Sequence, residues 1–220
     1  MFGIKAFMSS TEDTISRLRT FSTCELCDGA GLYHSMHHDI SHRVGPAHIC
    51  GPALTIEVPG GKGGLIADAI LQAKPGQVIV IAGHGNCDSS YWGDHRSVCA
   101  QMMGVEAVVI DGAYRDKDDC EAVGLPIFAR GVTCCAASKS NEGAVNVPVS
   151  CGGVTVHPGD FIIGDVNGVC VLRPQEAEKA MEQALKKRKL QEAVVRHMRR
   201  TGQVIPKLKG FVPDPEDWEE

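Results

Sequence analysis

The sequence has few aromatic side chains, no excess of positive charge and no long apolar run. Only 5% of its 220 residues are aromatic, and 27 Asp and Glu outnumber 22 Lys and Arg, for a net charge of −5. A mildly acidic chain lacks the electrostatic footprint of non-specific nucleic-acid binding. No apolar run approaches the roughly 20 residues of a membrane span, and residues 1–8 lack a secretory pattern. We therefore expect a cytoplasmic protein that binds neither nucleic acid nor membranes.

Cysteine, by contrast, is frequent in an otherwise ordinary globular composition. The chain holds 10 cysteines: Cys24, Cys27, Cys50, Cys87, Cys99, Cys120, Cys134, Cys135, Cys151 and Cys170. Without a secretory signal they are interpreted as reduced thiols, and those in apolar stretches as small hydrophobic residues. The adjacent pair Cys134 and Cys135 is expected to be buried.

The first two thirds of the chain alternate apolar runs with helical patterns. Strands are expected at 53–58, 77–82, 105–110 and 126–129, and helices at 65–73, 94–103 and 115–122. Residues 84–86 form a predicted glycine-rich loop between the second strand and its helix. Continuous apolar strands that alternate with helices indicate a parallel or mixed sheet covered on both faces, which is an α/β fold.

Both ends of the chain carry further signals. Ser9 and Glu12 have capping-box spacing, and Ser22 and Thr23 predict a second short helix. Short strands are expected at 147–149, 154–156, 161–164 and 169–172, which gives a β-rich second half. A long helix is predicted from Pro174 to about residue 200, because its acidic start and basic end complement the helix dipole. The tail, 206–220, is expected to be mobile or to cover a neighbour.

Two loops that follow neighbouring apolar strands carry the candidate chemistry. Open α/β folds place ligands at the carboxyl edge of the sheet, where both loops should lie. In the first loop, Gly93-Asp94-His95-Arg96, the free amides of a helix start form an anion site. In the second, Arg115 can hold a carboxylate with its planar fork, and Asp116 is a hard oxygen ligand for Mg²⁺ or Mn²⁺. Together they suit an α-keto acid, although an Arg-Asp pair alone is more often a surface feature.

Asp94, twenty intervening residues and then Arg115-Asp116 resemble the signature of the 4-hydroxy-4-methyl-2-oxoglutarate aldolase family, which also contains the regulator of ribonuclease activity A. The resemblance extends from about Thr23 to Pro174. The supporting stretches are Cys27-Asp28, Gly51–Thr55, Val109–Gly112, Pro126–Phe128, Pro148-Val149, Gly152-Gly153, Pro158–Asp160 and Gly164–Val169. Each stretch alone is weak evidence for the family, but their order and spacing together are fairly specific to it.

The resemblance implies a metal-dependent lyase that cleaves oxo acids, and decarboxylates oxaloacetate, through a pyruvate enolate. Residues Gly93 to Arg96 would bind the substrate carboxylate, Arg115 the keto-acid end, and Asp116 the Mg²⁺ or Mn²⁺, on which Asp94 would act through water. The fold would be a swivelling phosphohistidine-type α/β/α domain with a long C-terminal helix. Residues 1–220 would form one domain, with a core at 23–174 and a helix and tail at 174–220, assembled into homotrimers or hexamers.

Two features of the sequence leave alternatives open. His95 and Arg96 stand where family members commonly carry small apolar residues. The extra cation beside the site would suit a more highly charged acid or indicate a changed specificity. The acidic residue that a neighbouring subunit would add to the site is not identified, although Glu192 or a tail Glu would serve. Because the fold is shared, a non-catalytic ring-shaped inhibitor of a ribonuclease E type enzyme is the alternative function.

Cys24 and Cys27, followed by His34, His37 and His38, are residue types that bind zinc, but no second Cys-x-x-Cys or well-spaced His pair completes a zinc module. One helical turn separates the two cysteines, so shared burial as core thiols is the favoured interpretation. A quinone-precursor methyltransferase is a third alternative, but the incomplete Gly-x-Gly pattern at Gly83–Gly85 gives it no nucleotide-binding loop.

Overall fold

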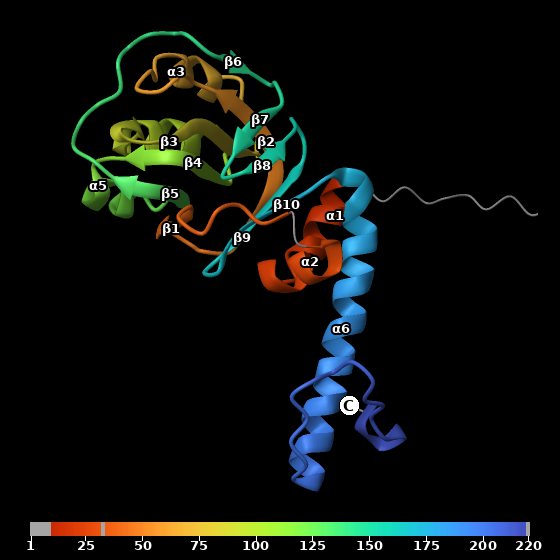
Figure 1. Ribbon diagram of the computed structural model, residues 1–220. Coiled ribbons are helices and arrows are strands. Elements are labelled where there is room, and N and C mark those ends of the chain that lie inside the picture. Colours follow the sequence, from red (N-terminus) through yellow and green to blue (C-terminus); the bar gives the residue numbers. More distant parts are fainter. Residues whose placement is uncertain (1–9, 32–33, 219–220) are drawn as a thin grey trace, which may run out of the picture.

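A computed structural model describes residues 10–31 and 34–218 of the chain. Within those residues, strands pair in the order β1-β5-β4-β3-β2-β9-β10, and β6 adds an eighth strand beside β2 (Figure 1). The strands of this sheet are β1 (Ser41–Val44), β2 (Ile49–Glu57), β3 (Val78–Trp92), β4 (Ala107–Tyr114), β5 (Ile127–Val132), β6 (Ala144–Val145), β9 (Phe161–Asp165) and β10 (Gly168–Leu172). A separate hairpin joins β7 (Val149–Cys151) to β8 (Val154–Val156).

The helices are α1 (Thr11–Leu18), α2 (Thr23–Ala30), α3 (Leu65–Ile70), α4 (Asp94–Met102), α5 (Lys117–Val123), α6 (Pro174–Thr201) and the 3₁₀ helix η2 (Pro215–Trp218). None of the helices in the described part of the chain is both long and apolar enough to cross a membrane.

The centre of the sheet is parallel and its edges are antiparallel. Strands β2, β3, β4 and β5 run parallel, whereas β1 runs antiparallel to β5 and β9 antiparallel to β2. Every residue of β4 is buried, as expected of a central strand that is covered on both faces. The predicted mixed α/β sheet is confirmed.

Different structures cover the two faces of the parallel strands. Helices α3, α4 and α5 bury one face, with Ile66, Ala100 and Cys120 packed into that core. The hairpin β7–β8 contributes Val149 and Val156 to the core on the other face. The expected α/β/α layering is therefore wrong for these strands, because short strands replace helices on the second face. The resemblance to a swivelling phosphohistidine-type domain stays a prediction.

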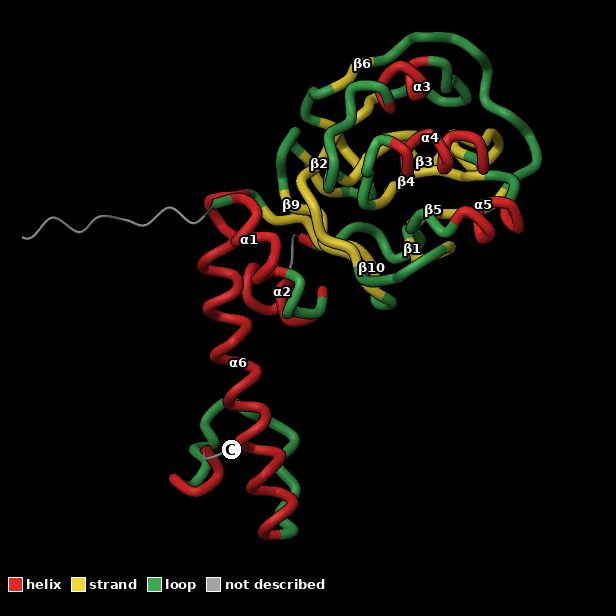
Figure 2. Tube along the Cα trace, turned by 180° about the vertical axis from the view of Figure 1, so that it is seen from behind, coloured by secondary structure: helices red, strands yellow, loops and turns green. Residues whose placement is uncertain are grey.

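Helices α1 and α2 lie beside the first half of α6, away from α3–α5 (Figure 2). The packing of α2 on α6 is close, because a Cβ at Gly29 would lie 2.2 Å from the carbonyl oxygen of Ala180. Arg188 of α6 donates to the Glu25 carboxylate from Nε at 2.5 Å and from Nη2 at 3.0 Å. Glu25 also completes the capping box with Ser22 at the start of the short helix that the sequence predicted.

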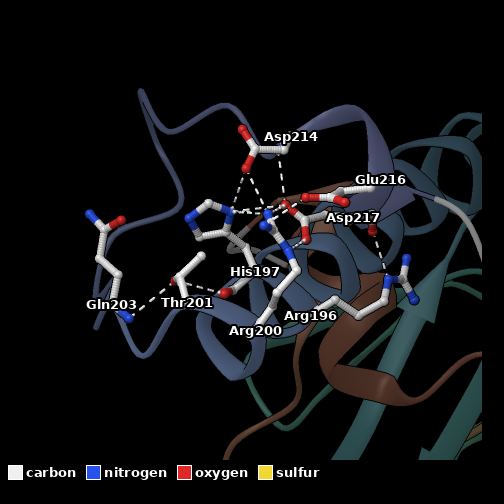
Figure 3. Close-up of polar contacts among 8 residues, drawn as sticks. All are labelled: Arg196, His197, Arg200, Thr201, Gln203, Asp214, Glu216 and Asp217. Atoms are coloured by element: carbon white, nitrogen blue, oxygen red, sulfur yellow. Dashed lines mark hydrogen bonds and ion pairs between the residues drawn. The ribbon is translucent and has the colours of Figure 1, made fainter.

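The long C-terminal helix is confirmed, and its second half extends away from the sheet (Figure 1). The expectation of a mobile tail is wrong within residues 206–218, because this segment folds back onto its own helix, whereas contact of the tail with a neighbour stays a prediction. Asp217 accepts a hydrogen bond from His197 Nδ1 at 2.8 Å and from Arg200 at 3.1 Å (Figure 3). Asp217 is 2% exposed, so the tail and α6 bury this carboxylate between them.

Several local predictions need correction. The predicted loop at residues 84–86 lies within β3, which continues to Trp92 beside β4 through shifts in register. The N-cap of α1 is Ser10, which accepts from the amide of Asp13, while Ser9 lies outside the described residues. Cys134 and Cys135 are exposed rather than buried, and Cys24 is exposed too.

Candidate active site

The two loops predicted to carry the chemistry meet at the carboxyl edge of the sheet. Strands β3 and β4 are parallel neighbours, with Trp92 paired to Tyr114 at their ends. The amide of Arg115 donates to the carbonyl of Trp92 at 3.0 Å, which ties the second loop to the first. Because parallel strands end at one edge, the chain brings Gly93 and Asp116 together although they are distant in sequence.

The loops line a cavity of about 230 Å³. Its walls are Ser90, Trp92, Gly93, Asp94, His95, Arg96, Arg115, Asp116, Ala136, Ala137 and Lys139. Every predicted site residue is therefore part of one cavity. It lies below the roughly 300–1,000 Å³ of pockets for drug-sized ligands, so it suits a small molecule. A larger groove of about 560 Å³ lies between α2 and α6, but its Lys187 and Arg188 are already paired with Asp28 and Glu25.

The start of α4 provides amide donors to the cavity. Gly93 is the N-cap in an extended conformation and gives no side-chain cap. The first amide to bond within the helix is that of Ser97, which donates to the Gly93 carbonyl at 3.0 Å. The amides of residues 94–96 therefore have no partner inside the helix, and their dipoles favour an anion. Trp92 Nε1 donates to Ser97 Oγ at 2.8 Å and so fixes this turn.

Arg115 and Asp116 form an ion pair at the mouth of the cavity. Arg115 Nε lies 3.1 Å from Asp116 Oδ2, and the two side chains are 45% and 33% exposed. Such an exposed pair stabilises the fold little, by up to about 1 kcal/mol. Asp116 has φ +55°, in the left-handed region. A left-handed aspartate is uncommon and is found more often at functional sites.

The Arg96 guanidinium has a structural role, whereas its charge suggested that it would bind the substrate. Its guanidinium donates to the carbonyl of Gly63 at 2.7 Å and to the carbonyl of Tyr91. Burial, together with the charge of Arg115, lowers the pKa of Arg96. The Arg96 side chain therefore braces the cavity wall. Its backbone amide can donate to an anion, and its positive charge adds to the potential in the cavity. His95 remains exposed beside Cys99.

Sequence reasoning missed the third wall, which comes from the loop after β5. Lys139, a basic residue, lines the cavity next to Ala136 and Ala137. Ser90 holds this loop, because its amide donates to the Cys135 carbonyl at 2.8 Å and its carbonyl accepts from Ala137 at 3.2 Å. No local pattern marks Lys139 as a site residue, since its place depends on pairing with β3.

Other aspartates of the family motifs have structural partners. Asp111 is buried and accepts from Arg130 and from the amide of Gly152, which holds the β7–β8 hairpin on the sheet. Asp165 accepts from the amide and hydroxyl of Thr23 at 2.8 and 2.7 Å. These hydrogen bonds lower the pKa of Asp165 against the opposing effect of burial. These motif residues hold the fold and lie outside the cavity lining.

The cysteine and histidine cluster does not form a metal site in the described part of the chain. There, three potential ligands come together only in His37-His38-Asp39 and in His197-Asp214-Asp217. Neither group includes Cys24 or Cys27. Cys27 is half-buried against the core of α2, so the core interpretation holds for Cys27 and is wrong for the exposed Cys24.

A mixed α/β fold with a cavity at its sheet edge defines the class of this protein, and comparison with known proteins gives its family. The RraA-like family model, described as Aldolase/RraA, matches residues 23–171. The chain therefore belongs to the RraA-like family.

A relative from Halalkalibacterium halodurans is 37% identical over 187 residues, covering 84% of this chain and 89% of its own. Its name is "Putative 4-hydroxy-4-methyl-2-oxoglutarate aldolase". The crystal structure of Streptomyces coelicolor RraAS2, described as an unusual member of the RNase ES inhibitor RraA family, has a TM-score of 0.77 at 26% identity. That match covers 86% of this chain and 98% of the other. An uncharacterized protein from Pseudomonas syringae shares the fold, with a TM-score of 0.78 at 24% identity over 92% and 96% of the two chains.

Proposed function

We propose that this protein is a divalent-metal-dependent lyase that cleaves a carbon–carbon bond in small oxo-carboxylic acids. The observation that carries the proposal is the cavity shared by the α4 amides, Arg115, Asp94 and Asp116. Its lining holds the basic side chains Arg96, Arg115 and Lys139 against two carboxylates. This balance favours an anionic substrate. The aldolase name of the 37% identical relative supports the same reaction class.

The donor set of the cavity fits Mg²⁺ or Mn²⁺. Asp94 and Asp116 are hard oxygen donors, and Mg²⁺ is commonly held by one or two carboxylates with water and substrate in the other positions. Among the described residues, no group of three close protein ligands includes either aspartate, so the other ligands would have to be water and substrate. Asp116 would hold the cation and Asp94 would act on it through water. When bound, the cation would polarise the keto oxygen of the substrate.

The protein's own groups would bind the substrate and stabilise the charge that develops during cleavage. Amides of residues 94–96 would donate to its carboxylate, and the Arg115 guanidinium would face the keto-acid end. When a base, here water, takes the hydroxyl proton, the bond between the hydroxyl-bearing carbon and the carbon next to the keto group breaks. This leaves a second carbonyl compound and a pyruvate enolate, which becomes pyruvate when its carbon takes a proton from water. Arg115 stabilises the enolate charge, and the same enolate forms when oxaloacetate loses CO₂, so one site serves both reactions.

The reaction is tested by pyruvate release from a panel of oxo acids that includes 4-hydroxy-4-methyl-2-oxoglutarate, 4-carboxy-4-hydroxy-2-oxoadipate and oxaloacetate. Activity should disappear after exhaustive chelation and return with Mg²⁺ or Mn²⁺. Full activity in the chelated protein would contradict the metal requirement. If no oxo acid yields pyruvate and the protein instead inhibits a ribonuclease E type enzyme, the regulator function stands in its place.

The proposal includes a closed assembly of three subunits or two such rings, with the site near a subunit boundary. The extended second half of α6 is long enough to contact another copy (Figure 1). Light scattering at micromolar concentration should give the mass of a trimer or hexamer, and a monomer alone would contradict this part.

A further inference from the structure

Two adjacent thiols, Cys134 and Cys135, come directly before the cavity-lining part of the loop after β5, the wall that the sequence analysis did not predict. Cys134 and Cys135 are both exposed, and the next residues, Ala136 and Ala137, line the cavity with Lys139. Among the cysteines of the described residues, Cys134 and Cys135 are the only two that are adjacent in sequence. Neither thiol belongs to the cavity lining itself, so the pair has no part in the proposed cleavage.

The backbone around this pair is anchored on both sides. The amide of Thr133 donates to the carbonyl of Tyr114 at 2.9 Å, at the end of β4. The carbonyl of Cys135 accepts from the amide of Ser90 at 2.8 Å, and Ala137 donates back to Ser90 at 3.2 Å. The Cys135 carbonyl belongs to the next peptide unit, so a change in the peptide between the two cysteines reaches the hydrogen bond that holds the wall to β3 through a single Cα, that of Cys135.

A disulfide between adjacent residues must distort that peptide. Consecutive Cα atoms lie about 3.8 Å apart, whereas disulfides usually span roughly 4.4–6.8 Å between Cα atoms. The small ring is thus strained, and strained, exposed disulfides are the labile and regulatory ones. Because Thr133 is fixed to the end of β4 on one side, the distortion should pass through Cys135 to its carbonyl, so the Ser90 bond should weaken and Ala136 and Ala137 should move.

We propose that Cys134 and Cys135 form a reversible redox site that sets the shape of the cavity. A hydroperoxide is the oxidant. One thiolate attacks a peroxide oxygen, which gives a sulfenic acid and releases an alcohol or water. The second thiol then attacks the sulfenic sulfur and expels water, so two thiols and one hydroperoxide give one disulfide. The effect on turnover rests on the proposed function, while the movement of the wall does not.

Other thiols of the chain are poorer candidates. Cys50 and Cys151 are buried, and burial raises the pKa of the Cys50 thiol to about 12. Cys87 is exposed, but partial burial raises its pKa despite the nearby Arg130. Cys24 is exposed on α2, away from the cavity lining, and serves as a matched control.

The sequence allows direct detection of the disulfide. Arg130 and Lys139 are tryptic sites, so trypsin releases the peptide 131–139, whose cysteines are Cys134 and Cys135 alone. After treatment with hydrogen peroxide, this peptide should be lighter by two hydrogen atoms, and tris(2-carboxyethyl)phosphine should restore its mass. Pyruvate release by the oxidised wild type should fall about tenfold or more, the scale of a small misplacement in an active site, and recover on reduction.

Variants and a fluorescent reporter separate this effect from other damage. Cys134→Ser and Cys135→Ser should keep their activity in peroxide, whereas Cys24→Ser should respond like the wild type. The chain has 2 tryptophans, so a Trp218→Phe background leaves Trp92 of the cavity wall as the only reporter. Its emission should change on oxidation and revert on reduction.

Three results would overturn the redox site: no disulfide in peptide 131–139, a disulfide without any change in Trp92 emission, or equal peroxide sensitivity in the serine variants. A reduced wild type that releases no pyruvate would instead count against the proposed function. The Trp92 signal would still decide whether the thiols move the wall.

Discussion

Gly93 and Asp116 approach so closely that a Cβ at residue 93 would lie 2.7 Å from Asp116 Oδ2 and 3.4 Å from Arg115 Cγ. The backbone of Gly93 is extended, with φ −171°, a conformation open to any residue. Glycine is thus needed here for space, since a methyl group would displace the carboxylate assigned to the metal.

We predict that Gly93→Ala lowers kcat/KM about tenfold or more, because the Asp116 carboxylate must move from its productive position. The unfolding midpoint should change little. Gly60→Ala is the matched control, since a Cβ there would lie 3.7 Å from its nearest neighbour, an ordinary contact. Turnover like that of the wild type in Gly93→Ala would show that Asp116 is not a ligand at this position.

Sequence patterns predicted the elements that depend on local order. The apolar runs gave the four parallel strands and their helices, and the placement of Gly93 and Arg115 followed from the rule that parallel strands end at one edge. Contacts between segments that are distant in the sequence could not be predicted from these local patterns. The polar strand β1 exists because it pairs with β5, where Arg43 also donates to Ala129 and Arg130 carbonyls. Lys139 joins the site through a loop that Ser90 holds, a contact that no periodicity encodes.

The tail illustrates the same limit with charges. Its acidic and proline-rich composition is typical of a mobile segment, but Asp214 and Asp217 find Arg200 and His197 on α6. Composition describes how many charges a segment carries, whereas its order depends on whether partners lie within reach.

The Glu25–Arg188 pair should make the free energy of unfolding depend on pH in the acidic range. The hydrogen bond from Arg188 lowers the pKa of Glu25 to about 2, against an ordinary 4.5. The stabilisation is thus complete above about pH 4.5 and is lost as the pH falls toward 2. We predict that Glu25→Gln lowers the free energy of unfolding by about 1 kcal/mol at pH 7.

Urea unfolding at a series of pH values measures this difference, which should shrink steadily below pH 4.5. Glu121→Gln, at an exposed position of α5, is the control and should follow the wild type throughout. If the difference in the free energy of unfolding between Glu25→Gln and wild type stays constant down to pH 2.5, it does not come from this ion pair.

The tail should be released by loss of one buried charge. Arg200, and then His197, hold the pKa of Asp217 at about 2, so its carboxylate stays charged and the contact persists until the pH approaches that value. Asp217→Asn removes the charge and keeps the shape. We predict several-fold faster tryptic cleavage after Lys207 and Lys209 in this variant, because the tail opens more often.

Glu216→Gln is the control for the tail. Glu216 pairs with the same Arg200 at 2.6 Å but is 63% exposed, so its loss should change the cleavage rate much less (Figure 3). Equal cleavage rates in the two variants would show that the buried contact does not hold the tail.

The Arg115 guanidinium and the Asp116 carboxylate are the groups on which the proposed chemistry depends. Arg115→Lys keeps the charge but loses the planar fork, and Asp116→Ala removes the proposed metal ligand. Each should cost on the order of 3 kcal/mol of transition-state stabilisation, roughly a hundredfold in rate. Because the pair is exposed, the fold should survive both changes.

The most direct measurement is therefore the turnover of folded, correctly assembled Arg115→Lys in aldol cleavage and in oxaloacetate decarboxylation. The enolate mechanism predicts that both rates fall together by about a hundredfold. Near wild-type turnover in both reactions would make Arg115 a surface residue and would place the active site elsewhere.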